Sequence, residues 1–398
     1  MDPSEDLGVP SVFSLGLSLF FVWLLLFFAL LRREFTLAAP AAGVLLLMHA
    51  TRLWSALSLR RLELTISPER DRVFPGEDVA IGVELKNNKP LAIRLRLEIG
   101  FHGSLKPEES LQGETRLSPF EESFRVFRLV AVKRGVVPLG PAKVVAGDIF
   151  GLHSRRRRYP SDREIVVFPR IRPFRSFPIP FQEYLGIHAS KGLVEDPAWY
   201  AGTREYSGNR PARNIHWKAS ARLGVLQEKL FEPTSHRKVL LVLDAGLFGL
   251  EEGIPDRGPF EETVEVLASV AKALMETGAS FGLVTNAGGL EASASLLPLG
   301  RGPEHLGDLL EMLARARMSV AAELAFLFEK ATQSAMGSIY FGAEPRNLLP
   351  RLYSGGSSRG FGTIFVFARG RAGEEVRGNR WRGNRAYLTD ELIDVPGK

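Results

Sequence analysis

The chain contains no cysteine among its 398 residues. This absence excludes disulfides, thiolate zinc sites, iron–sulfur clusters and every mechanism that uses a thiol nucleophile. It does not settle the compartment, because a cysteine-free protein is tolerated on either side of a membrane.

Two common signatures of catalysis are also missing. The sequence has no G-x-x-x-x-G-K-[ST] loop for a nucleotide and no H-E-x-x-H pair for zinc. His216, Ser220 and Asp244 supply the residue types of a hydrolytic triad, but their order and spacing match no known arrangement. We therefore expect a protein that is not an enzyme, with no catalytic residue and no cofactor.

Composition and length are those of a multidomain globular protein. The 398 residues allow two soluble domains besides a membrane segment, and 45% apolar with 24% charged residues is ordinary for folded material. The net charge of +6 fits a body near an anionic membrane surface or one that meets acidic partners. No recognisable nucleic-acid fold signature is present, so we expect no nucleic-acid partner.

Residues 1–60 have the pattern of a membrane anchor. An uncharged apolar run extends from Val12 to Leu31, and about 20 such residues are what a helix needs to cross a bilayer. After the charged residues 32–34, a weaker apolar run continues from Phe35 to about Leu57. The leading M-D-P-S-E-D is acidic, whereas a signal peptide begins with basic residues. We predict a transmembrane helical hairpin in the cell membrane, with the lipid bilayer as its first partner.

Basic residues near the helix ends bear on the orientation. Arg32 and Arg33 lie in the short turn, and Arg60, Arg61 and further arginines follow the second helix. Because cytoplasmic segments carry an excess of Lys and Arg, this balance favours soluble domains on the cytoplasmic side.

Residues 61–170 have the period of half-buried strands. Apolar residues alternate with Arg or Glu, and turn sequences such as F-P-G-E-D separate the runs. Short strands at this spacing predict an antiparallel, immunoglobulin-like β-sandwich. Such domains act as spacers or docking modules.

Four consecutive arginines, Arg155 to Arg158, stand out in this domain. They could bind the phosphates of nucleic acid or of lipid headgroups. The other interpretation is a solvated, cationic hairpin tip, which is what most short charge runs form.

Residues 237–398 alternate between strand and helix patterns. The apolar run from Val239 to Leu243 is typical of a strand buried on both faces, and a helix follows between Pro259 and Gly278. We expect further strands at 281–285, 339–341 and 363–368, and helices at 303–316 and 320–333. This alternation predicts a Rossmann-type parallel sheet with helices on both faces.

Between the two domains, the connector 171–236 holds the stretch R-E-Y-S-G-N-R-P-A-R-N-I-H-W-K-A-S-A-R, residues 204–222. Residues 214–220 alternate in a strand-like way, which would place Ile215, Trp217 and Ala219 on one face. One interpretation is an interdomain latch, with Tyr and Trp as packing anchors. The other is a cationic groove for an acidic partner peptide or an anion. The residues concerned are Arg204, Tyr206, Arg210, Arg213, Trp217, Lys218 and Arg222.

This stretch resembles the signature of the bacterial domain-of-unknown-function 58 family, although Asn209 stands where the family usually has Asp. The segment Gly147 to Leu152 resembles that family's D-P-F-G-L turn, with Ile149 in place of Pro. The resemblance implies a von Willebrand factor A-like domain after the signature, and a partnership with a MoxR-type AAA ATPase and other proteins. We therefore expect a membrane-anchored, non-catalytic protein-interaction or adaptor protein.

The resemblance also implies where a divalent cation would sit. The family's D-x-S-x-S motif corresponds to Asp244-Ala245-Gly246-Leu247-Phe248, in which both hydroxyl positions are lost. Because magnesium takes close to six oxygen ligands, Gly246 and Phe248 make this a degenerate site. We predict no bound metal, with Asp244 capping a strand-end loop or a neighbouring helix. The alternative function is a divalent-metal-dependent ligand-binding or adhesion domain.

Overall fold

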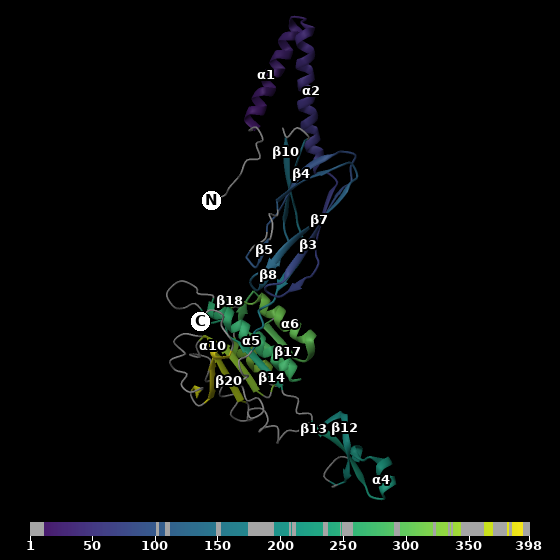
Figure 1. The fold of residues 1–398 in the computed structure, drawn as a ribbon, viewed down its shortest axis with the longest axis vertical. Helices are drawn as coiled ribbons and strands as arrows, with labels where there is room; N and C mark the ends of the chain where they lie inside the picture. The colour runs from purple at the N-terminus through teal and green to yellow at the C-terminus, as the bar shows by residue number, and fades with distance from the viewer. Residues whose placement is uncertain are drawn as a thin grey trace. The chain divides into compact units, whose positions relative to one another are not determined.

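The computed structural model describes residues 12–100, 103–107, 112–148, 153–173, 195–206, 208, 212–233, 238–246, 248, 258–289, 295–320, 324–332, 335, 337–343, 362–368, 380–381 and 384–392. The chain divides into two compact units, Met1–Phe168 and Pro169–Lys398. Figure 1 shows the elements of both.

The first unit begins with two apolar helices, α1 (Val12–Leu31) and α2 (Phe35–Ser58), which contact each other as a hairpin. The ring of Trp23 meets His49 edge-on, with 6.2 Å between the centroids. Among the residues whose side chains are described, α2 is long and apolar enough to cross a membrane, and those of α1 form a shorter apolar stretch, Gly16–Leu31. One candidate membrane helix near the amino terminus is consistent with the expected membrane attachment.

The last two turns of α2 pack on the following domain. Thr51, Ser55 and Ser58 lie on one face of the helix and are buried, and α2 contacts the hairpin formed by β9 (Ala142–Gly147) and β10 (Ser154–Tyr159). The indole N–H of Trp54 donates to the carbonyl of Ala92 at 3.1 Å. The carboxyl end of α2 and the β-domain therefore form one body.

This domain is a sandwich of two antiparallel four-stranded sheets, as the alternating sequence predicts. The sheets have the orders β1-β3-β7-β5 and β10-β9-β4-β6, and a small third sheet has the order β2-β11-β8. The strands are β1 (Leu62–Pro68), β2 (Arg72–Val73), β3 (Asp78–Asn87), β4 (Ile93–Ile99), β5 (Leu105–Pro107), β6 (Gln112–Leu117), β7 (Glu122–Ala131), β8 (Gly135–Pro138), β9 (Ala142–Gly147), β10 (Ser154–Tyr159) and β11 (Glu164–Val167).

Strand period determines which side chains of the sandwich are buried. In β4, Ile93, Leu95 and Leu97 are almost fully buried, because alternate residues of a strand point to the same face. Together with their counterparts from the other strands they form one continuous apolar core.

The interpretation of the four arginines as a hairpin tip is wrong. Arg155 to Arg158 lie within the edge strand β10, which pairs with β9. The D-P-F-G-L-like residues 149–152 lie outside the described part of the chain.

The second unit contains a seven-stranded sheet of order β17-β15-β14-β19-β20-β22-β21, formed by β14 (Lys238–Leu243), β15 (Ser280–Thr285), β17 (Leu296–Gly300), β19 (Gly337–Gly342), β20 (Gly362–Phe367), β21 (Arg380–Trp381) and β22 (Asn384–Leu388). The five central strands are parallel, and the edge strands β17 and β21 are antiparallel. The predicted parallel sheet is present. Its edge strands were not foreseen.

Helices cover both faces of this sheet. On one face α7 (Leu324–Thr332) contributes Leu324 and Phe328 to a cluster with Leu240 and Val242 of β14. On the other face α5 (Gly258–Glu276) packs against β14, β15 and β19, and also contacts α6 (Gly302–Arg315) and the short α10 (Thr389–Leu392). The second unit is therefore a doubly wound α/β fold.

One helix prediction is wrong at its start. The expected helix 320–333 begins at Leu324, because Arg317–Val320 form the strand β18, which pairs with β16 (Ala287–Gly288). Gly288 makes this pairing possible, since a Cβ there would lie 2.0 Å from the Ser319 hydroxyl.

The signature residues form a separate hairpin in the same unit, which we call the signature hairpin. Its strands β12 (Glu195–Glu205) and β13 (Gln227–Pro233) are antiparallel, and the 3-10 turn η2 (Ala212–Asn214) and helix α4 (Trp217–Leu223) connect them. The strand-like prediction for 214–220 is therefore wrong after Ile215. Helix α4 begins at an N-cap, His216, and ends before Gly224, which has a φ of 69°.

Candidate functional site

Asp244 lies directly after β14, at the point where the strand order of the seven-stranded sheet reverses. If the short strand β21 is left out and the remaining strands of the seven-stranded sheet are renumbered in chain order, their spatial order is 3-2-1-4-5-6. Strands β14 and β19 therefore flank the point where the order reverses. In doubly wound folds ligands bind outside the carboxyl ends of the strands at this point. Asp244 therefore occupies the position where the fold class places a functional site.

Both carboxylate oxygens of Asp244 accept hydrogen bonds from the protein itself. Oδ1 accepts from the Asn286 side-chain amide at 2.8 Å and from the backbone N–H of Gly246 at 2.9 Å. Oδ2 accepts from the Tyr340 hydroxyl at 2.7 Å. Asp244 exposes only 4% of its surface, and Asn286 and Tyr340 are equally buried. We call these three residues the Asp244 cluster.

The cluster also organises the loop after β14. The side-chain oxygen of Asn286 accepts from the backbone N–H of Ala245 at 2.8 Å, so Asn286 contacts both the carboxylate and the loop. Burial, and then the adjacent Asp244 charge, raises the pKa of Tyr340 well above its ordinary value. The phenol is thus held protonated as a donor, and the expected loop-capping role of Asp244 matches these contacts.

Gly246 and Phe248, which follow Asp244 in the loop after β14, have well-defined surroundings. A Cβ on Gly246 would meet Asp244 Oδ1 at 3.0 Å, so a larger residue would press against the carboxylate. Phe248 is buried and its ring packs edge-on against Phe260 of α5, with centroids 5.2 Å apart. Among the described residues, no group of three His, Cys, Asp or Glu side chains is placed to hold a metal ion. Leu247 lies outside them.

Sequence reasoning identified Asp244 but not its two partners. Asn286 follows β15 and Tyr340 lies within β19, opposite Val242 of β14. Polar residues at the ends of neighbouring parallel strands were the available signal, because such ends meet at one sheet edge. The partner set depends on strand order, which the sequence alone did not give.

The spacing G-x-S-x-G, which hydrolases use to expose a nucleophilic serine between a strand and a helix, occurs at 278–282 and 356–360. In the first, Ser280 instead begins strand β15 after helix α5, and its hydroxyl accepts from Arg301 Nε at 2.6 Å. Ser280 is buried, so this match lacks the geometry of an elbow. The second match lies outside the described residues.

In the signature hairpin, Arg204 pairs across the two strands. Its Nε contacts Glu228 Oε1 at 2.5 Å, and Glu228 is completely buried. The backbone N–H of Tyr206 donates to Leu226 at 2.8 Å. This ion pair therefore joins β12 and β13 at the end of the hairpin next to the connecting segment. Arg210 and the side chain of Arg213 lie outside the described part.

His216 and Ser220 serve the local fold of this hairpin. His216 Nδ1 accepts from the backbone N–H of Ala219 at 3.1 Å, which caps α4. The Ser220 hydroxyl donates to the carbonyl of His216 and accepts from the backbone N–H of Gln227 at 2.8 Å. These contacts fix the start of α4 against the start of β13.

The outer surface of the hairpin carries apolar and cationic side chains together. Trp217 exposes 68% of its surface, and Leu223, Val225 and Leu226 are also exposed. Lys218 and Arg222 are exposed on the same helix, and no described residue of α4 is buried. We call the residues Trp217, Lys218, Arg222, Leu223, Val225 and Leu226 the hairpin surface.

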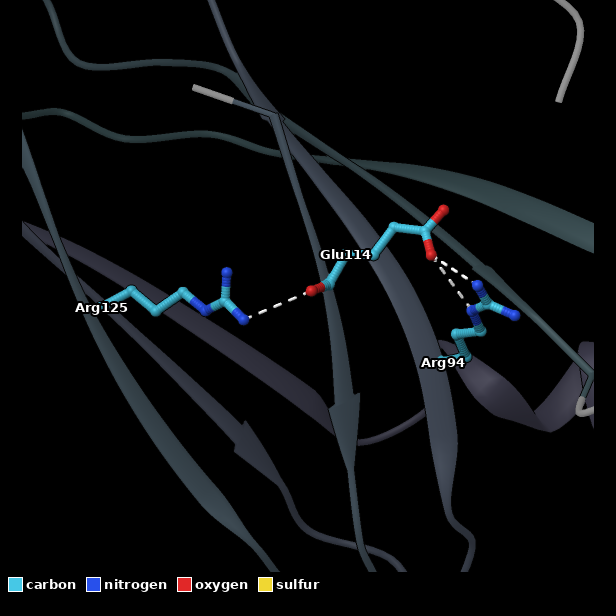
Figure 2. Close-up of polar contacts among 3 residues, drawn as sticks. All are labelled: Arg94, Glu114 and Arg125. Carbon is cyan, nitrogen blue, oxygen red and sulfur yellow. Dashed lines mark hydrogen bonds and ion pairs between the residues drawn. The ribbon is translucent and has the colours of Figure 1, made fainter. Parts of the chain in front are cut away.

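A second polar feature lies in the sandwich, beside a cavity of about 330 Å³ lined by Ala92, Ile93, Arg94, Glu114, Thr115 and Arg116. Arg94 binds the Glu114 carboxylate at 2.6 Å, while Arg125 reaches from β7 and donates to the Glu114 backbone carbonyl at 3.3 Å (Figure 2). The three residues tie β4, β6 and β7 together at the open edge of the sandwich. These contacts give Arg94, Glu114 and Arg125 a structural role in the sandwich.

No family model matches the chain. It is 24% identical over 270 residues to the uncharacterized protein YeaD of Bacillus subtilis, which covers 66% of this chain and 64% of that protein. The chain thus spans less than two thirds of the relative's length.

Two solved structures share only weak likeness. The FixG-related protein from Vibrio parahaemolyticus is 8% identical, over 27% of this chain and 98% of that one, with a TM-score of 0.20. Alpha-2-macroglobulin of E. coli is 11% identical, over 36% of this chain and 9% of that one, with a TM-score of 0.22. TM-scores of this size carry no argument about fold or function.

Proposed function

We propose that the chain is a membrane-anchored, non-catalytic interaction protein, with a MoxR-type AAA ATPase as its expected partner. In this proposal α1 and α2 form a two-span anchor, and the soluble domains lie on the cytoplasmic side. The resemblance of residues 204–222 to the domain-of-unknown-function 58 signature supplies the partner. The doubly wound sheet supports the von Willebrand factor A-like assignment that the same resemblance implies.

The hairpin surface is the observation on which this proposal rests. An exposed Trp beside exposed Leu and Val side chains is unusual for a surface that meets only water. Trp and Arg are also the residue types that dominate binding energy at protein interfaces. Lys218 and Arg222 add positive charge at its rim, so the partner surface should combine an apolar pocket with acidic side chains.

The Asp244 cluster bears on the alternative, a metal-dependent ligand-binding domain. A divalent cation would need the oxygens of Asp244, and these already accept from Asn286, Gly246 and Tyr340. Metal binding would have to displace buried hydrogen bonds and supply its remaining ligands from elsewhere. We therefore favour recognition that does not depend on a metal.

A pull-down from detergent extracts tests the proposal. Tagged full-length chain should recover the ATPase, and Trp217→Ala should lower the recovery at least tenfold, because an interface Trp contributes about 2 kcal/mol or more. Phe120→Ala is the matched control, since Phe120 is an equally exposed aromatic residue in the sandwich. Wild-type chain that recovers no ATPase, with or without nucleotide, would contradict the proposal.

A further inference from the structure

Seven arginines surround the end of α2, and the structure connects one of them directly to the helix. Arg157 of β10 donates to the carbonyl of Leu59, just after the helix end, at 3.4 Å, and its guanidinium stacks 5.0 Å from the ring of Tyr159. The Tyr159 hydroxyl donates to the carbonyl of Leu62 at 3.2 Å. The arginine strand is therefore fixed beside the point where α2 enters the sandwich.

The other six arginines, which we call the basic collar, are exposed. They are Arg52, Arg60, Arg61, Arg155, Arg156 and Arg158. β10 lies at the edge of its sheet and runs beside the last turns of α2 (Figure 1). Because side chains alternate along a strand, Arg156 and Arg158 point to one face of the sheet and Arg155 to the other. The collar thus presents cations on both sides of the strand.

The collar begins where the exposed apolar surface of α2 ends. The exposed apolar side chains of this helix are Phe35, Leu37, Val44, Leu46, Leu47 and Leu53. Beyond Leu53 the exposed charged residues of α2 and its exit are all arginines, and the segments 51–61 and 153–159 contain no acidic residue. Trp54 lies at the same level, and Trp is typical of the membrane–water interface. This sequence of apolar, aromatic and cationic surface is the profile of a helix that leaves a bilayer.

We propose that the basic collar binds the headgroup phosphates of anionic phospholipids on the side of the membrane where α2 ends. This inference rests on the membrane anchor in the proposed function, and it adds a lipid specificity that the anchor alone does not require. Guanidinium groups bind phosphate oxygens through paired hydrogen bonds, and an anionic leaflet attracts cations held within a Debye length. Bound headgroups would also fix the sandwich against the membrane surface, because β10 is part of that domain.

Lipid retention by the purified full-length chain tests this inference. Native mass spectrometry from neutral detergent should show phosphatidylglycerol retained in preference to phosphatidylcholine. The triple variant Arg155→Gln, Arg156→Gln and Arg158→Gln should lose about a hundredfold in apparent affinity for phosphatidylglycerol, since each interfacial cation contributes about fivefold. Replacing the same three residues by Lys should retain the preference, because the charge remains.

The matched control removes three exposed cations from elsewhere in the same domain: Arg70→Gln, Arg128→Gln and Lys133→Gln. It should change the affinity by less than about threefold, since net charge acts weakly when it is remote from the headgroups. Equal melting temperatures of the two triple variants would show that any difference arises at the collar.

Three results would overturn the inference. Equal retention of both lipids by wild-type chain that resists carbonate extraction would leave the anchor intact and refute the lipid site. Extraction of the chain by carbonate would refute the anchor and the lipid site together. The third result is that wild-type chain retains both lipids equally and binds a fluorescent oligonucleotide, and that the collar variant, unlike the control variant, loses this binding. It would show that the arginines bind nucleic acid.

Discussion

Replacing Tyr340 by Phe should destabilise the seven-stranded sheet around the carboxyl ends of β14 and β19 by about 2 kcal/mol. The substitution removes the hydroxyl that donates to Asp244 Oδ2 at 2.7 Å. Hydrogen bonds to charged groups contribute about 1.5–3 kcal/mol, and both residues are buried, so water cannot replace the donor. The ring is retained, and its packing against Phe365 and Phe367 should persist. The loss therefore measures the hydrogen bond and not a cavity.

Hydrogen exchange of the full-length chain is the suitable assay, because it reports the opening of individual strands. Amides of β14 and β19 should exchange about thirtyfold faster in Tyr340→Phe, the factor that corresponds to about 2 kcal/mol. Ser338→Ala is the control in the same strand. It removes a neutral hydroxyl pair with Thr363, 3.0 Å long, which contributes about 1 kcal/mol.

We expect a larger effect for Tyr340→Phe than for Ser338→Ala, because only the first change removes a donor from a buried carboxylate. Equal exchange rates in the two variants, or no change in Tyr340→Phe, would show that the Asp244 carboxylate does not depend on the phenol. The Asp244 cluster would then be open to an external ligand.

Three further substitutions, at Lys89, Arg204 and Gly246, have predictable effects. Burial lowers the pKa of Lys89 to about 8, below the ordinary value of 10.5 that it has in the unfolded chain. Between pH 8 and 10.5 the unfolded chain therefore binds a proton that the folded chain has released, and the stability of the fold should rise with pH in that window. The Lys89→Met variant should lose this rise and should have a higher melting temperature than wild type at pH 7. Arg204→Ala should weaken the signature hairpin by about 2 kcal/mol, because the buried Glu228 carboxylate loses its ion pair with Arg204, and limited proteolysis would detect the loosened segment. Gly246→Ser should lower the melting temperature without creating a magnesium site, since its Cβ would press on the Asp244 carboxylate.

The sequence was most informative where a period is strong and local. The apolar run of β14 and the helical spacing of α5 predicted both elements, and the alternation in β4 predicted its buried face. Arg155 to Arg158 gave no apolar alternation, because β10 is an edge strand whose conformation comes from pairing with β9. Its place beside α2 depends on contacts almost 100 residues apart in the chain.

The signature stretch shows a different limit. Apolar and polar residues alternate along 214–220, as they would in a strand. The segment instead contains most of a helix that begins at the N-cap His216 and ends before Gly224, which has a left-handed conformation. A Gly eight residues after the capping position, Gly224 after His216, was the signal that favoured the helix. The latch interpretation treated Trp217 as a packing anchor, but α4 is short and no described residue of it is buried, so Trp217 lies at the surface of the hairpin.

Titration calorimetry with magnesium or manganese tests most directly whether the donors from its own fold, which reach both oxygens of the Asp244 carboxylate, leave no site for a divalent cation. We expect no heat beyond dilution for the full-length chain, and the same trace for Asp244→Asn. One ion bound per chain, with the binding lost in Asp244→Asn, would contradict it.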